Sequence, residues 1–175
     1  YCLNLGGFSN VSFNENGKRI AFDISPVNTV LNFYANQLNL DYDDKGLIAQ
    51  LGKLNQYLFE ELNALPFYSK SHPKSLGFEF VKETVLPLIE KHPISRADKM
   101  HTFTIHIAFQ IGKALSHKKA KLLITGGGAY NDFLIEEIQK QLPEMEIIIP
   151  NKKILEYKEA LIFALLGVLK LRNEI

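Results

Sequence analysis

Two glycine-rich turns are the segments of this chain best suited to chemistry. Gly126, Gly127 and Gly128 end an apolar run and precede a helical pattern, and Gly6 and Gly7 follow an apolar start. Glycine lacks a Cβ, so a ligand can approach the backbone closely, and a helix N-terminus offers N–H groups to an anion. The first glycine turn (6–7) and the second glycine turn (126–128) therefore predict a nucleotide-type site. A plain β-turn and a tight strand-to-helix turn without a ligand stay open as alternatives.

Polar residues near these turns could complete such a site. Asp23 ends an apolar-alternating segment, where a carboxylate could act as a general base, hold a water bound to Mg²⁺, or only cap a turn. Asn10 follows the first glycine turn. Asn131 and Glu159 lie near the starts of two predicted helices, where each could contact a nucleotide or only stabilise the helix N-terminus.

Three further residues are candidates for the substrate side of the site. Asn28 could cap a helix that begins after Pro26. Lys74 and Ser75 lead from a loop into another predicted helix, whose N-terminus could face a phosphate or a sugar, or Ser75 could simply cap it.

Composition narrows the class of protein. A chain of 175 residues with 46% apolar and 22% charged residues is long enough for one domain with a core. A net charge of +1 gives no support to nucleic-acid binding, and the basic cluster at 117–121 is typical of a solvated edge. The apolar stretch at 160–169 is too short to span a membrane and predicts a buried helix.

The cysteine and histidine residues do not suggest a metal centre. One cysteine, Cys2, excludes an internal disulfide and a thiolate cluster. His101 and His106 are five positions apart, unlike a helical zinc pair, so we interpret all five histidines as structural or exposed. The single cysteine and the lack of a signal-peptide pattern favour a cytoplasmic protein.

The elements that must position the site begin with a β-meander. Apolar alternation predicts strands at 3–5, 11–13 and 20–24, with Asn16-Gly17 as a hairpin turn. Helical periodicity then follows at 28–38, at 46–63 and at 75–90, the last with a kink or a boundary at Pro87. Residues 102–111 alternate as a strand would, but recurrence at every fourth position and the polar lead at 95–98 favour one long helix.

The last third of the chain alternates between strand and helix. The pattern predicts a strand at 121–125, a helix at 132–142, a strand at 146–149 and a helix at 156–171. Such an order implies a parallel sheet with a right-handed crossover, whose ligands collect at the carboxyl ends of the strands. Because a meander precedes this part, the predicted fold class is α/β with a mixed sheet and flanking helices.

The motifs together resemble the C-terminal half of a 1,6-anhydro-N-acetylmuramic acid kinase. They are NLGGFSNVSF at 4–13, FDISPVN at 22–28, YDDKGLIAQLGK at 42–53, PFYSKSHPKSLGFEF at 66–80, TGGGAYN at 125–131 and KEALIFALL at 158–166. The resemblance implies one actin-like ATPase (ribonuclease H-like) lobe over 1–175. It also implies that the N-terminal lobe, which carries the family's first phosphate turn, is absent from this chain, so we expect the chain alone to be inactive.

The resemblance implies a reaction as well as a fold. In this family an aspartate that matches Asp23 activates water to open the anhydro bridge of the sugar, and the freed O6 takes the γ-phosphate of MgATP during peptidoglycan recycling. The first glycine turn with Asn10 would hold phosphate, and the second with Asn131 and Glu159 would approach the nucleotide. The implied partners are ATP, Mg²⁺, the anhydro-amino sugar, the absent lobe and a second copy in a homodimer, without nucleic acid or membrane.

The chain departs from the family pattern at four positions. Ser25 and Val27 stand where many members have glycine, Asn32 where they tend to carry aspartate, and Phe78 where they tend to carry arginine. Two other functions stay open beside this family: another actin-like sugar or acetate kinase lobe, and a non-catalytic module for dimerisation or binding.

Overall fold

The computed structural model describes residues 1–115 and 119–174. A five-stranded sheet has the order β3-β2-β1-β4-β5. Its strands are β1 (Cys2–Leu5), β2 (Phe8–Glu15), β3 (Lys18–Pro26), β4 (Lys121–Thr125) and β5 (Glu146–Ile148). The first three strands pair antiparallel, whereas β4 pairs parallel with β1 and β5 pairs parallel with β4. The predicted mixed sheet with an N-terminal meander is therefore confirmed.

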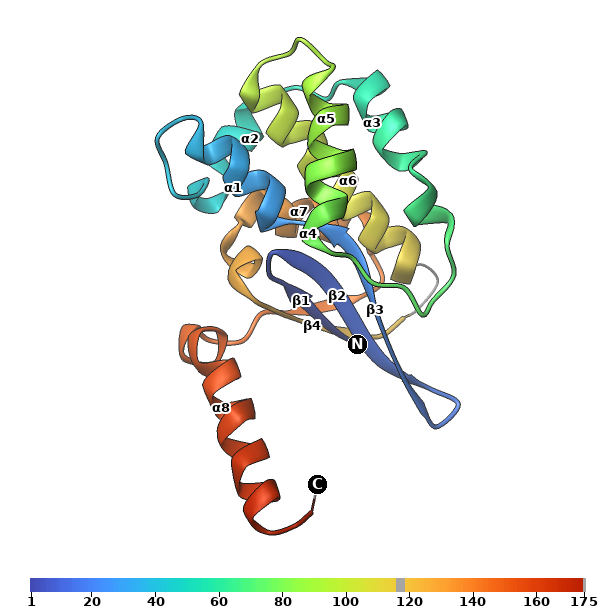
Figure 1. Ribbon diagram of the computed structural model, residues 1–175, viewed down its shortest axis with the longest axis vertical. Helices are drawn as coiled ribbons and strands as arrows, with labels where there is room; N and C mark the ends of the chain where they lie inside the picture. Colours follow the sequence, from blue (N-terminus) through green and yellow to red (C-terminus); the bar gives the residue numbers. More distant parts are fainter. Residues whose placement is uncertain (116–118, 175) are drawn as a thin grey trace.

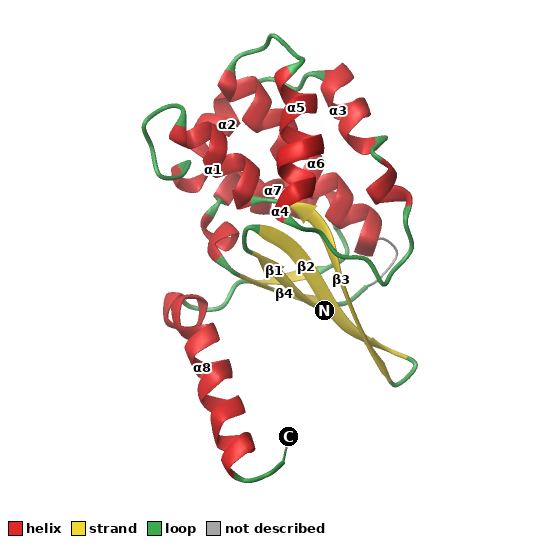
Figure 2. Ribbon diagram, in the orientation of Figure 1, coloured by secondary structure: helices red, strands yellow, loops and turns green. Residues whose placement is uncertain are grey.

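The helices are distributed unequally about this sheet. They are α1 (Asn28–Asn36), α2 (Leu47–Leu51), α3 (Gln56–Asn63), α4 (Phe78–Phe80), α5 (Leu86–Glu90), α6 (Arg96–Leu115), α7 (Asp132–Gln141) and α8 (Lys152–Leu171). Helices α1 to α7 gather on one side of the sheet, and α8 extends away on the other side (Figure 1). Figure 2 shows the same division between the helical layer and the strands.

Helix α6 runs through the middle of the core. Phe103, Ile107 and Ile111 recur at every fourth position and are wholly buried. This spacing forms one apolar stripe on a helix, so the helical alternative for 102–111 is confirmed. The stripe belongs to the same core as Leu3 and Leu5 of β1, which links the helical layer to the strands that carry the first glycine turn.

The expectation of one helix over 46–63 is wrong, because the helix breaks at Gly52. A Cβ at Gly52 would lie 2.2 Å from the carbonyl oxygen of Ala97, so α6 packs directly against this backbone. Asn55 then starts α3 by accepting a hydrogen bond from the amide of Leu58. Leu51 is consequently exposed, although it had the spacing of a core residue. The kink or boundary expected at Pro87 lies near an irregularity: a π-helical turn at Val81–Val85 joins α4 to α5, and Pro87 is the second residue of α5.

The expectation of a buried helix over 160–169 is also wrong. None of the residues of α8 is buried in the described structure, and Leu161 and Phe163 are 68% and 72% exposed. Apolar composition predicts that another surface covers the helix, but it does not identify that surface. No helix within 1–115 or 119–174 combines the length and apolarity needed to cross a membrane.

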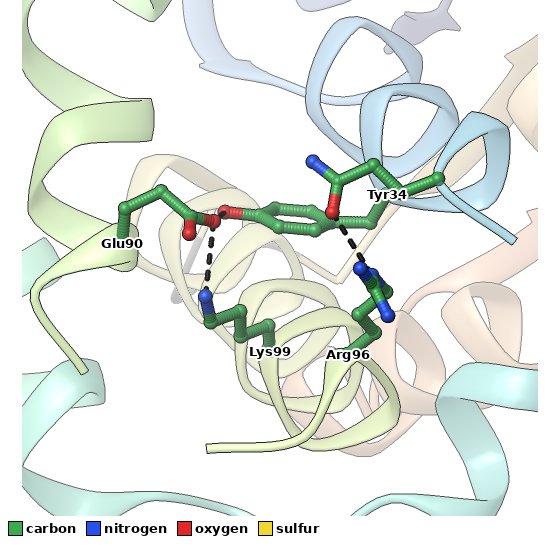
Figure 3. A network of polar contacts seen from close by, with 5 residues as sticks. Tyr34, Glu90, Arg96 and Lys99 are labelled. Atoms are coloured by element: carbon green, nitrogen blue, oxygen red, sulfur yellow. Dashed lines mark hydrogen bonds and ion pairs between the residues drawn. The ribbon is translucent and has the colours of Figure 1, made fainter. Parts of the chain in front are cut away.

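The ends of α1, α5 and α6 meet in a polar network (Figure 3). The Tyr34 hydroxyl donates to Oε1 of Glu90 at 2.8 Å, and the Lys99 ammonium donates to the same oxygen at 2.9 Å. Arg96 donates to Gln37 at 2.9 Å beside them. Tyr34 and Lys99 are buried, so this shared carboxylate oxygen joins α1, α5 and α6 within the helical layer.

The basic cluster expected at 117–121 lies only partly within the described structure. His117 and Lys118 lie outside the described residues, whereas Lys119 and Lys121 are exposed. The exposed part agrees with a solvated edge.

Candidate active site

The two glycine turns meet at the carboxyl ends of β1 and β4. These strands are parallel neighbours, so the turns that follow them emerge at the same edge of the sheet. Gly126 has a φ of +89°, and a Cβ there would lie 2.6 Å from the carbonyl oxygen of Leu5. Only glycine therefore allows the second turn to pack against the end of β1, immediately before Gly6.

The first glycine turn is also fixed to the start of α1. The carbonyl oxygen of Gly7 accepts hydrogen bonds from the amide of Val27 and from Oγ1 of Thr29, both at 2.8 Å. Val27 is the residue that precedes the helix, and no side chain caps it, so the capping role considered for Asn28 is wrong. The side chain of Asn28 instead lies close to Gly127, where a Cβ would be 3.6 Å from its Nδ2 atom.

A cavity of about 680 Å³ opens beside the second glycine turn. Its walls are the start of α1, the segment 42–45, the turn into α7 and the start of α8. The lining residues are Asn28, Leu31, Asn32, Tyr42, Asp43, Asp44, Lys45, Gly127, Gly128, Ala129, Tyr130, Asn131, Asp132, Ile149, Lys152 and Glu156. The structure thus brings four of the predicted residues together here: Asn28, Gly127, Gly128 and Asn131.

Hydrogen bonds explain why some lining residues are held in place. Both carboxylate oxygens of Asp43 accept backbone amides at the start of α2, each at 2.9 Å. Oδ1 of Asn131 accepts the amide of Leu134 at 2.9 Å, which confirms the capping role considered for Asn131. A Cβ at Gly46, which has a φ of +75°, would be 2.2 Å from Oδ1 of Asn131. The segment 42–46 therefore packs against the turn into α7 and closes one wall of the cavity.

Two ion pairs line the rim of the cavity. Nζ of Lys45 lies 3.9 Å from Oδ2 of Asp132. Nζ of Lys152 lies 3.5 Å from Oε1 of Glu156, which is one helical turn further along α8. Reasoning from the sequence missed these four side chains, although residues 42–45 lie in one of the motifs that carry the family resemblance. Glu159, which was predicted, is exposed and does not line the cavity, whereas Glu156 does.

A second group of site residues forms a row across four strands. The register pairs Asp23 with Asn10, Asn10 with Asn4, and Asn4 with Thr125. Residues directly opposite one another point to the same face of a sheet, so these side chains share the face opposite the buried Leu3 and Leu5. Strands lie about 4.8 Å apart, which places Asp23 roughly 10 Å from Asn4 along this polar row. Asn4 and Thr125 were not predicted as site residues. Thr125 directly precedes the second glycine turn, and one residue separates Asn4 from the first glycine turn.

The segment 74–76 orients Asp23. The amide of Leu76 donates to Oδ2 of Asp23 at 2.8 Å, and the amide of Asp23 donates to the carbonyl oxygen of Lys74 at 3.0 Å. The loop therefore runs along β3 through its backbone. Gly77, not Ser75, is the residue that precedes the helix, so the capping role considered for Ser75 is wrong.

The Lys74 side chain turns toward an aromatic ring. Its Nζ lies 4.7 Å from the centre of the Phe67 ring. Burial, with a smaller contribution from the charge of Lys113, lowers the pKa of Lys74. Lys74, Ser75, Asp23 and the residues of the first glycine turn lie outside the cavity lining, so the site has two parts that meet at the glycine turns.

The four departures from the family pattern fall in different environments. Val27 is wholly buried, and Ser25 is buried with its amide donating to Oγ of Ser9 at 3.1 Å. Phe78 is 59% exposed. Asn32 alone among the four lines the cavity.

Within the described residues, no group of three or more histidine, cysteine, aspartate or glutamate side chains could hold a metal ion. His106 is wholly buried and His72 is exposed, in agreement with a structural or exposed role for the described histidines. Cys2 is exposed.

Comparison with known proteins identifies relatives over almost the whole chain. The family model described as anhydro-N-acetylmuramic acid kinase matches residues 1–174. The anhydro-N-acetylmuramic acid kinase of Hydrogenovibrio crunogenus is 34% identical over 80% of this chain and 40% of its own length. That of Saccharophagus degradans is 33% identical over 98% of this chain and 48% of its own length. The chain thus spans slightly less than half the length of these relatives.

Solved structures share the fold at low sequence identity. The activator of 2-hydroxyisocaproyl-CoA dehydratase from Clostridium difficile, solved with bound ADPNP, matches with a TM-score of 0.54 and 14% identity, over 99% of this chain and 62% of its own. Component A of (R)-2-hydroxyglutaryl-CoA dehydratase from Acidaminococcus fermentans matches with a TM-score of 0.52 and 18% identity, over 89% of this chain and 56% of its own. The architecture is that of the actin-like ATPase fold, and the sequence comparison is specific: the chain belongs to the anhydro-N-acetylmuramic acid kinase family.

Proposed function

We propose that this chain is the C-terminal lobe of a kinase that opens the 1,6-anhydro bond of anhydro-N-acetylmuramic acid and phosphorylates O6 with ATP. The observation that carries the proposal is the meeting of two glycine turns at the carboxyl ends of β1 and β4, in a chain of this family. The reaction belongs to peptidoglycan recycling in the cytoplasm.

The cavity binds the base and ribose of the nucleotide, and the glycine turns bind its phosphates. Tyr42, Tyr130 and Ile149 are partly exposed on the cavity wall and offer apolar surface to a base and ribose. The second glycine turn leads from this wall toward the first, so the phosphates lie over bare backbone between them. Phosphoryl transfer depends mainly on positioning and charge neutralisation, which suits a cradle of this kind.

Asp23 is the general base. Its carboxylate takes a proton from water, the water oxygen attacks C1 of the sugar, and the bond from C1 to the bridging oxygen breaks. The released O6 then attacks the γ-phosphorus, the bond from that phosphorus to the oxygen bridging it to the β-phosphorus breaks, and ADP leaves. A carboxylate held by the Leu76 amide keeps one oxygen oriented while the other faces the reaction, so the loop 74–76 supports the base.

Asp23 would be the protein carboxylate that contacts Mg²⁺ through water, and the phosphates of the nucleotide would be its main ligands. Bound in that way, Mg²⁺ would neutralise charge on the transferring phosphate.

A substitution at Gly127 tests the nucleotide site. A Cβ at Gly127 would meet only Nδ2 of Asn28 at 3.6 Å, so Gly127→Val is tolerated by the fold but intrudes on the nucleotide. In the intact protein we expect ATP affinity, measured by calorimetry, to fall at least about tenfold. Gly167→Val is the matched control, because a Cβ at Gly167 meets nothing within 4 Å. Unchanged ATP affinity in Gly127→Val would contradict the proposal.

A second experiment tests the division into lobes. Closure of two lobes excludes bulk water from transfer, so we propose that this chain alone does not turn over substrate. Phosphate transfer should appear when the chain is combined with the half of the Saccharophagus degradans kinase that it does not cover. A panel of anhydro-N-acetylmuramic acid, hexoses and acetate then separates this activity from that of another actin-like kinase.

The exposed apolar surface of α8 favours a second candidate function, that of a module that forms a dimer with another copy of the chain. Leu165 and Leu166 are 56% and 42% exposed, and such a surface commonly marks an interface. Light scattering should then report a dimer that Leu165→Lys dissociates. Full kinase activity in a monomeric Leu165→Lys variant would exclude a role for this dimer in catalysis.

A further inference from the structure

Helix α8 brings a lysine to the carboxyl ends of β1 and β4. The ammonium of Lys158 donates hydrogen bonds to Oδ1 of Asn4 at 2.8 Å and to Oγ1 of Thr125 at 3.1 Å. Asn4 and Thr125 are paired across the two strands and belong to the polar row. Lys158 thus helps to fix the first half of α8 to the sheet, together with Leu155, which packs against the core.

This contact lies at the junction of the two glycine turns. A Cβ at Gly126 would be 2.9 Å from Oδ1 of Asn4, and a Cβ at Gly6 would be 3.2 Å from Nδ2 of the same amide. Thr125 directly precedes Gly126. The amide that holds the Lys158 ammonium therefore touches both turns, and the positive charge lies beside the bare backbone of each.

The hydrogen-bond and ion-pair partners of Lys158 differ from those of the other lysines near the site. Lys45 and Lys152 each lie beside a carboxylate on the cavity rim. In the described structure, the two hydrogen bonds of Lys158 go to an amide and a hydroxyl, which are uncharged. The carboxylate of the polar row, that of Asp23, lies two strands from Asn4, or roughly 10 Å. A half-buried ammonium with neutral partners attracts an anion.

We propose that Lys158 binds the phosphate groups of the nucleotide at the junction of the two glycine turns. The proposal rests on the nucleotide-binding function proposed above. An ammonium has three N–H donors, of which Asn4 and Thr125 accept two, and the third donates to a phosphate oxygen. Because Lys158 belongs to α8, phosphate binding also strengthens the contact between this helix and the sheet.

Paired titrations of the intact protein with ATP and with adenosine test this role. Lys158→Met keeps the alkyl stem but removes the charge, and Lys158→Gln keeps a donor for Asn4 and Thr125. In both variants we expect ATP affinity to fall roughly tenfold to a hundredfold, while adenosine affinity stays within about twofold. Lys158→Arg should retain most of the ATP affinity. Lys170→Met, an exposed lysine on the same helix, is the matched control.

The outcomes separate this proposal from the one on which it rests. ATP affinity that is unchanged in both uncharged variants would overturn the role of Lys158 and leave the nucleotide site intact. Equal losses for ATP and adenosine would assign Lys158 a structural role only, and would also overturn it. A wild-type protein that binds neither ligand would contradict the proposed function itself, and the role of Lys158 with it. Thermal unfolding of each variant confirms that the comparison is made on folded protein.

Discussion

The backbone amide of Leu76 donates a hydrogen bond of 2.8 Å to Oδ2 of Asp23, although the two residues are 53 positions apart. The amide of Asp23 in turn donates to the carbonyl oxygen of Lys74. The loop before α4 is therefore the support of the proposed base. This pairing gives a structural reason why the segments 22–28 and 66–80 both carry the family resemblance.

Replacing Asp23 by asparagine should separate catalysis from folding. The asparagine oxygen still accepts the Leu76 amide, so we expect the free energy of unfolding to change by less than about 1 kcal/mol. Loss of the base should lower turnover by roughly 100-fold to 10,000-fold in the intact protein. A coupled assay of ADP release measures this, with the exposed Asp41→Asn as control. Turnover at the wild-type rate in Asp23→Asn would show that another group is the base.

Alanine substitutions in the second glycine turn should have unequal effects on stability. Gly126→Ala places a Cβ 2.6 Å from the Leu5 carbonyl oxygen at a positive φ, so we expect a loss of at least about 2 kcal/mol. Gly127→Ala meets only an ordinary contact at 3.6 Å and should change stability by less than about 0.5 kcal/mol. Urea unfolding monitored by circular dichroism compares the two. Equal stabilities would mean that the second turn does not pack against β1 as described.

His106 should make the protein less stable in mild acid. Its Nδ1 donates to Oδ1 of Asn63 at 2.8 Å, and Nε2 is buried without a partner in the described structure. Burial lowers the pKa of His106 from 6.5 to about 3. Between these values the unfolded chain binds a proton that the folded chain does not, so stability falls as the pH drops below 6.5.

The size of the His106 effect can be measured between pH 7 and pH 5. Each pH unit below 6.5 costs at most about 1.4 kcal/mol, which gives about 2 kcal/mol at pH 5. His106→Gln keeps a donor toward Asn63 and should remove this part of the pH dependence, whereas the exposed His72→Gln should not. Identical pH profiles for wild type and His106→Gln would refute the assignment.

The shared carboxylate of Glu90 should contribute to the packing of three helices (Figure 3). Hydrogen bonds from Lys99 and Tyr34 lower the pKa of Glu90. Glu90→Ala leaves the buried Lys99 ammonium without its ion pair, and we expect a loss of roughly 1 to 3 kcal/mol in thermal or urea unfolding. Glu83→Ala, at an exposed position, is the control. Because the pKa of Glu90 is lowered, the contribution of Glu90 should persist above pH 4.5 and disappear as the pH falls through its folded value.

Local sequence patterns predicted an element correctly where the residues that determine it lie within one short segment of the chain. The Asn16-Gly17 hairpin, the strand before the second glycine turn and the long helix α6 were all predicted and are confirmed. Local patterns failed where a distant backbone intervenes. Ala97 packs against Gly52 and breaks a helix whose own periodicity continues through it.

The same distinction holds for the site and explains what the sequence alone determined. Glycine content, apolar spacing and family motifs are local properties, and they placed the two turns, Asp23 and the mixed sheet. Only the tertiary structure decided that Asn10, Asn4 and Thr125 join Asp23 in one row, that Lys158 reaches this row, and that α8 is exposed. Strand register and helix docking are set by contacts between residues far apart in the chain, and no short segment encodes them.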